Sequence, residues 1–294
     1  MTVALTLVVL GMLAPYVLRR VDGRLPTSTV IAAHLAALLL VWIGIVDIVV
    51  GAAGLAHRLV EFCELALQDP PTGGNARSLL LVTVVVATTA GRAVRVWWRT
   101  ARATHRTRRR LLCAATRTEH DVIFTRLGSV ACTVGLLRPR TFVDNTVFPA
   151  LTKPQRMAVL AHERGHVRGR HGLIDLVARC MAAGLAPWPG ARLAHAETRR
   201  HLEALADDRA AAKTSRRTVA AAIVTAATMP PQPALGAAGW SSWRVDRMLD
   251  PRPRHRPMVG AAAILILLAI LVLTQTVGHL LAGVHLLPLA FPAL

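Results

Sequence analysis

The chain has 294 residues, of which 53% are hydrophobic and 4% aromatic, and its mean hydropathy is +0.45. This composition is too apolar for an ordinary soluble domain and indicates membrane spans. The net charge of +19 comes mainly from arginine, but the sequence has no helix-turn-helix or finger pattern, so direct nucleic-acid binding is not expected. The four scattered cysteines, with no C-x-x-C pair, argue against a disulfide framework or a cysteine metal cluster.

Three apolar stretches predict transmembrane helices at about 1–18, 30–50 and 78–98, and a fourth is expected within 257–294. Arginines cluster after the first span, after the third and before the fourth. These clusters share one side of the membrane if the N-terminus is outside. The positive-inside rule therefore predicts a multi-pass protein of the cell membrane whose segment 99–256 is cytoplasmic.

Two polar stretches border these spans. Residues 57–77 contain acidic side chains and a Pro-Pro-Thr-Gly-Gly cluster, and are expected to form an outside loop. The arginine-rich run 99–110 is interpreted as a cytoplasmic flank that lies on anionic lipid.

The cytoplasmic segment begins with a predicted small sheet. Short β-type runs at 121–125, 130–134 and 140–143 are separated by glycine and proline. This sheet makes the segment an α+β domain inserted between the third and fourth spans of a mainly α membrane protein.

Helices are expected after the sheet. Thr152 and Gln155 form a T-x-x-Q capping box with Pro154 in the first turn, and Gly169 and Gly172 mark the end of that helix. Further helices are expected at 173–185, 191–212 and 218–228.

The predicted helix after Thr152 contains His162-Glu163-Arg-Gly-His166, an H-E-x-x-H match. Residues four apart share one face of a helix, so both imidazoles can bind one Zn²⁺. Glu163 can then act as general base toward a zinc-bound water. The alternative is a basic amphipathic helix that carries two histidines by accident.

A catalytic zinc ion usually has three protein ligands, and the favoured third is Glu203. Glu203 and Asp207 form an E-x-x-x-D pair on one helix face, so Asp207 can orient a ligand histidine. The alternatives are Glu197, His195 and His201, or an acidic pair that only solvates an arginine-rich helix.

The only tyrosine is Tyr16, in the first predicted span. A tyrosine of the cytoplasmic domain therefore cannot stabilise the oxyanion of a tetrahedral intermediate. Zinc, an arginine, or a histidine such as His171, His195 or His201 are the remaining candidates.

Several stretches resemble the BlaR/MecR-type integral-membrane metallopeptidases. Residues 134–142 look like the family segment "fGllrPrI", residues 151–170 look like its zinc helix, and 203–207 stands where the family has E-L-x-C-D. Three predicted spans before the catalytic domain and one after it also match. Ala206 departs from the family by standing where cysteine is frequent.

The resemblance implies a gluzincin-like fold, a Zn²⁺ cofactor and cleavage of a cytoplasmic repressor of the BlaI/MecI kind. It also implies that the segment from Gly135 to Val143, with Gly135 and Pro139, forms an edge strand that aligns the substrate. The sequence stops a few residues after the fourth predicted span, so sensing through an extracellular penicillin-binding domain is not expected.

Two other functions stay open. HtpX-like quality-control proteases share H-E-x-x-H and E-x-x-x-D, but place more spans after the zinc helix. A non-proteolytic membrane regulator would keep a structural zinc closed by four protein ligands, with His171, His195 or His201 as the fourth.

Overall fold

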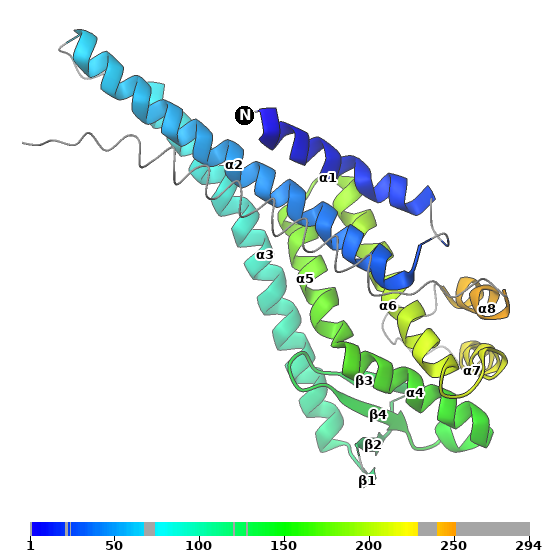
Figure 1. Cartoon of the computed structure of the whole chain (residues 1–294). Coiled ribbons are helices and arrows are strands. Elements are labelled where there is room, and N and C mark those ends of the chain that lie inside the picture. Colours follow the sequence, from blue (N-terminus) through cyan, green and yellow to red (C-terminus); the bar gives the residue numbers. More distant parts are fainter. Residues whose placement is uncertain are drawn as a thin grey trace, which may run out of the picture.

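The computed structural model describes residues 2–20, 23, 25–67, 74–119, 121–127, 129–228 and 240–250. It is mainly helical, with one small sheet (Figure 1). The predicted fourth span lies outside the described residues.

Three long helices open the chain: α1 (Thr2–Arg20), α2 (Thr27–Leu67) and α3 (Gly74–Cys113). Among the described residues, one segment, Thr27–Val49, is long and apolar enough to cross a membrane. It coincides with the second predicted span. The other spans stay predictions.

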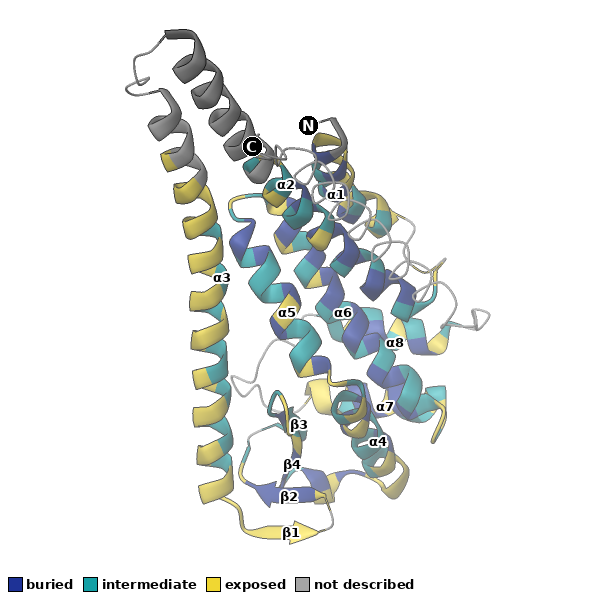
Figure 2. Ribbon diagram, turned by 60° about the vertical axis from the view of Figure 1, so that its left-hand side comes forward, coloured by how far each residue is buried: buried dark blue, intermediate teal, exposed yellow. Residues whose placement is uncertain are grey.

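The expected outside loop 57–77 is wrong in large part. Helix α2 continues to Leu67, and α3 begins at Gly74. The stretch after residue 50 is rich in alanine, leucine and glutamate. All three residue types have high helix propensity, so the polar residues in this stretch do not end the helix. The arginine run 99–110 continues α3 in a straight line (Figures 1 and 2), and its contact with anionic lipid stays a prediction.

The sheet contains β1 (Arg117–Glu119), β2 (Val122–Thr125), β3 (Ala131–Val134) and β4 (Arg140–Asp144), in the order β1-β2-β4-β3. Strands β2 and β4 are parallel, and the other two pairs are antiparallel. The three predicted strands are confirmed, and the exposed β1 is an addition. Within the described residues β3 pairs with β4 alone, so its other edge has no strand partner there.

The helices that follow are α4 (Lys153–Gly169), α5 (His171–Gly184), α6 (Pro189–Ala211), α7 (Arg216–Thr228) and α8 (Ser241–Leu249). The first four agree with the predicted helices to within a few residues. The Thr152–Gln155 capping box at the start of α4 is confirmed. Helix α8 had no counterpart in the sequence prediction.

Helices α5 and α6 form a hairpin that packs against α2 and α3 (Figures 1 and 2). Leu38 and Val41 of α2 share a buried core with alanines of both helices, including Ala178 and Ala191. The indole Nε1 of Trp42 donates to the Met181 carbonyl at 3.1 Å. The hairpin tip therefore lies beside the apolar part of α2, where no part of segment 99–256 was expected.

Candidate metal centre

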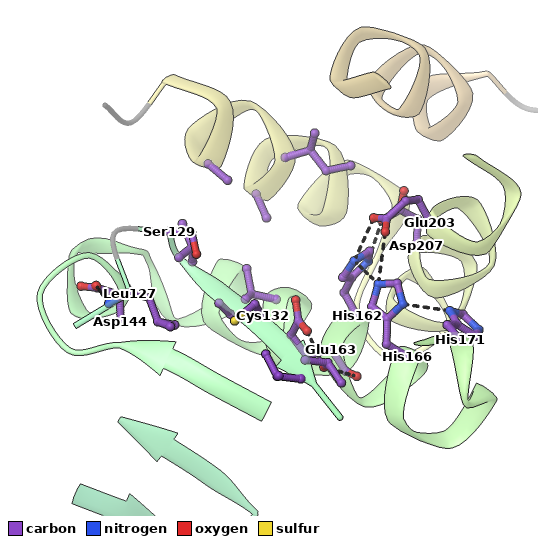
Figure 3. Close-up of a pocket in the computed structure, with 18 of the residues that line it drawn as sticks. Leu127, Ser129, Cys132, Asp144, His162, Glu163, His166, His171, Glu203 and Asp207 are labelled. Carbon is purple, nitrogen blue, oxygen red and sulfur yellow. Dashed lines mark hydrogen bonds and ion pairs between the residues drawn. The ribbon is translucent and has the colours of Figure 1, made fainter. Parts of the chain in front are cut away.

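The zinc-type motifs meet where α4 and α6 cross. A Cβ atom on Gly165 of α4 would lie 3.2 Å from the Cα atom of Ala206 on α6, so a small residue is needed at this crossing. The close contact brings the histidine face of α4 against the acidic face of α6. Figure 3 shows His162 and His166 facing Glu203 and Asp207.

Three donor atoms converge at this crossing. The Nε2 atoms of His162 and His166 lie 3.0 Å apart. The Glu203 carboxylate oxygens lie 3.5 Å from His162 Nε2 and 3.6 Å from His166 Nε2. Two ligands on a tetrahedral zinc ion are about 3.3 Å apart, so the donor set fits this metal. It is the one such group of metal-binding side chains found in the described part of the chain.

Each of these two histidines also has a partner on its far side. Asp207 Oδ1 lies 2.9 Å from His162 Nδ1. His171 Nδ1 lies 2.9 Å from His166 Nδ1. Such contacts fix the tautomer and the orientation of a metal-binding imidazole.

Arg244 of α8 compensates the negative charges of Glu203 and Asp207. Its guanidinium donates to both oxygens of Asp207, at 2.6 and 2.7 Å, and its Nη1 lies 3.2 Å from Glu203 Oε2. The side chain of Asp207 is 1% exposed, so this ion pair is shielded from water.

The metal-free centre is strongly polarised. Burial alone would lower the pKa of His162, but hydrogen bonds to Asp207 and Glu203 raise that pKa to about 10. Burial would raise the pKa of Glu203, but the hydrogen bond from His162 and the charge of His166 hold it well below its usual range. Burial and the neighbouring His166 lower the pKa of His171 to about 3, so this ring is neutral.

Glu163 points from α4 toward the edge strand β3 (Figure 3). Thr133 of β3 donates from its hydroxyl to Glu163 Oε2 at 2.6 Å. The neighbouring Cys132 is not a candidate nucleophile, because burial and the charge of Glu163 raise the pKa of its thiol to about 12. The Glu163 carboxylate is thus fixed by one hydrogen bond next to His162 and His166.

A cleft of about 1130 Å³ contains these groups and extends along β3. Its opposite wall includes the apolar side chains Val219, Ala222 and Ile223 of α7. Gly135 and Pro139 line the cleft from the β3–β4 turn. The predicted edge strand was therefore misplaced, because residues 140–144 form the interior strand β4, and the free edge belongs to Ala131–Val134.

Residues 99–230 match the family model described as Peptidase family M48. This match supports a metallopeptidase, and it covers the sheet, most of the cleft and all three converging donors. No curated protein and no solved structure matches the chain.

The rejected ligand candidates lie elsewhere within the matched M48 segment. His195 Nε2 pairs with Asp175 at 2.9 Å, and the ring of His201 packs edge-on against Trp243. Glu197 pairs with an arginine of the next helical turn. His171 stands behind His166 rather than at the cluster.

Arg244 is the site residue that sequence reasoning missed, and it lies beyond the matched segment. The available signal was indirect: a buried E-x-x-x-D pair requires a cation, and the short stretch around Arg244 alternates arginine with apolar residues at helical spacing. That pattern does not indicate which of its arginines enters the site.

Proposed function

We propose that the chain is an integral-membrane zinc metalloendopeptidase in which His162, His166 and Glu203 bind Zn²⁺. The observation that carries the proposal is the convergence of these donors in a cleft that also holds Glu163 and a free strand edge. The M48 match over the same residues supports a peptidase.

The residues around the donors have matching chemical roles. A bound zinc ion lowers the pKa of its water toward neutrality and polarises a carbonyl group. Glu163 accepts a proton from the attacking water and then gives it to the leaving amine. Thr133 holds the Glu163 carboxylate in one orientation through the 2.6 Å hydrogen bond. Asp207 fixes the ring of His162, while Arg244 compensates the acidic charge.

The free edge of β3 gives the cleft a means of holding a peptide. An extended substrate that adds to this edge forms main-chain hydrogen bonds with Ala131–Val134. Its scissile bond then lies near Glu163, because Thr133 of the same strand contacts that carboxylate. Gly135 and Pro139, in the turn between β3 and β4, line the cleft where one end of the bound substrate would lie.

The proposed location is the cell membrane, with the N-terminus outside and the catalytic centre on the cytoplasmic side. The apolar segment Thr27–Val49 supports one span. Helices α1 and α3 add side chains that are both apolar and exposed, which suits contact with lipid. They include Leu5, Leu10, Leu13 and Val17 of α1, and Leu80, Val94 and Trp97 of α3.

The proposed substrate is a cytoplasmic protein, with a BlaI/MecI-like transcriptional repressor as the first candidate. This part of the proposal rests on the resemblance to the BlaR/MecR-type proteases. A structural zinc site would be closed by a fourth protein ligand, whereas the cluster in the described residues has three donors. The geometry therefore favours the peptidase over a non-proteolytic regulator.

The test compares zinc content and peptide cleavage in the detergent-purified wild type, Glu163→Gln and Glu203→Ala. Glu163→Gln is expected to keep its zinc and to lose cleavage by about 10²–10⁴-fold, because only the general base is removed. Glu203→Ala is expected to lose zinc. Full cleavage by Glu163→Gln would refute the mechanism, and full zinc retention by Glu203→Ala would refute the ligand set.

A further inference from the structure

His171 contacts a ligand histidine from behind. It is the first residue of α5, it is 3% exposed, and its Nδ1 lies 2.9 Å from His166 Nδ1. The Nε2 atom of His166 instead faces His162 and Glu203. The two imidazole rings stand nearly perpendicular, at 89° (Figure 3). The contact is thus made at the ring nitrogen that a metal would leave free.

The chain holds His171 in this place by local features. Helix α4 ends at Gly169, and Arg170 takes the left-handed backbone conformation with φ of 48°, so that α5 begins directly at His171. A Cβ atom on Gly169 would lie 2.3 Å from His171 Nε2, so only glycine leaves room for the ring. Arg209 of α6 closes the far side, with its Nη1 at 3.2 Å from His171 Nε2 and donating to the Gly165 carbonyl at 2.6 Å.

We propose that His171 is a positioning residue that fixes the ring of His166 for metal binding. This inference rests on the proposed function, because it takes His166 as a ligand through Nε2. A neutral imidazole that binds a metal through Nε2 carries its proton on Nδ1. His166 then donates that proton to the lone pair on His171 Nδ1, and His171 carries its own proton on Nε2. In this state the 3.2 Å contact between Arg209 Nη1 and His171 Nε2 is not a hydrogen bond, and Arg209 donates to the Gly165 carbonyl instead.

The centre therefore orients its two histidine ligands by different means. His162 has the carboxylate of Asp207 at Nδ1, and His166 has the imidazole of His171 at the same atom. Neither the H-E-x-x-H pattern nor the E-x-x-x-D pattern includes His171. Its role follows only from the turn that places the start of α5 against the end of α4.

The test measures zinc affinity by chelator competition on the full-length, detergent-purified chain with three substitutions at one position. In His171→Asn the amide oxygen can take the place of the Nδ1 acceptor. In His171→Gln the amide reaches farther, to about the place of Nε2, and His171→Leu has no acceptor. Leu and Gln are expected to weaken zinc binding about 10–100-fold, and Asn is expected to restore most of it.

Several results would overturn the positioning role. One is a wild-type zinc affinity in His171→Leu, and another is a zinc affinity in His171→Asn no higher than in His171→Leu. A third is a loss of zinc binding in His171→Leu as complete as in Glu203→Ala, which would make His171 itself a ligand. Gly169→Ala is a second probe, because it keeps His171 but crowds its ring. It is expected to weaken zinc binding, and unchanged affinity would also count against the proposal.

Two controls separate the causes. Melting curves of the metal-free variants detect misfolding, and the Asn and Leu substitutions at position 171 should melt alike if the difference between them lies in the metal site. Glu203→Ala tests the ligand set independently. If it keeps zinc, the proposed function fails; if it loses zinc while His171→Leu does not, only the positioning role fails.

Discussion

Replacing Arg244 by methionine should strongly destabilise the metal-free protein. Arg244 donates twice to Asp207, whose side chain is 1% exposed, and also contacts Glu203. Methionine keeps much of the side-chain volume but removes the guanidinium from both carboxylates, so that His162 is left to compensate Asp207 and Glu203 alone. Breaking a buried ion pair by removing one partner costs about 3–5 kcal/mol of unfolding free energy.

Arg247, one turn further along α8, provides a matched control. It pairs with Asp208 at 2.6 Å, but the side chains of Arg247 and Asp208 are 24% and 37% exposed. Water screens such a pair, so Arg247→Met should cost about 0–1 kcal/mol. Both variants remove one arginine from the same helix and break a pair with a carboxylate. Arg247→Met also breaks a 3.0 Å hydrogen bond to Thr27 Oγ1, so a larger loss in Arg244→Met reflects the greater burial of its contact.

The assay is thermal unfolding of the chelator-treated protein in detergent, followed by circular dichroism. A loss of 3–5 kcal/mol corresponds to a melting temperature lower by roughly 6–20 °C for a chain of this size. Arg244→Met with no larger effect than Arg247→Met would refute the reasoning. Adding Asp207→Asn to Arg244→Met should recover part of the loss, because one of the two carboxylates that share His162 is then uncharged.

Three further perturbations test other parts of the structure. Thr133→Val should lower kcat/KM about 10–100-fold through loss of the hydrogen bond to Glu163, and Thr133→Ser should retain activity; equal activities would contradict the contact. The metal-free pKa of His162, about 10 against an ordinary 6.5, means that zinc binding at pH 7 releases a proton. Zinc affinity should therefore rise about tenfold per pH unit from pH 7 toward 10, and a flat profile in chelator competition would refute this. Gly184→Ala should cost about 1–3 kcal/mol, because its Cβ would lie 2.1 Å from the Trp42 ring, and an unchanged melting temperature would show that the hairpin does not pack on α2 as described.

Local sequence patterns predicted most of the secondary structure between residues 121 and 228. The Thr152–Gln155 capping box marked the start of α4, and short β-type runs separated by glycine and proline marked three of the four strands. These signals succeed because caps, turns and periodicity act within a few residues. The same approach failed at the end of α2, since polar composition alone does not terminate a helix.

The order of strands in the sheet could not be read from the same patterns. The resemblance pointed to Gly135 and Pro139 for the edge strand, whereas the free edge belongs to Ala131–Val134. Sequence shows where a strand begins and ends, but the position of a strand in a sheet depends on which partners it pairs with. The parallel pairing of β2 with β4 places β4 inside and leaves β3 at the edge.

The sequence by itself determined the pairing of His162 with His166, because four residues make about one helical turn and the separation is independent of the rest of the chain. Only the tertiary structure decided what surrounds that pair. The approach of Glu203 depends on the tight crossing at Gly165, and the entry of Arg244 depends on where α8 docks. The place of His171 behind His166 depends on the turn between two helices. These contacts join residues that are distant in sequence or lie across a turn, so they follow from packing rather than from any local pattern.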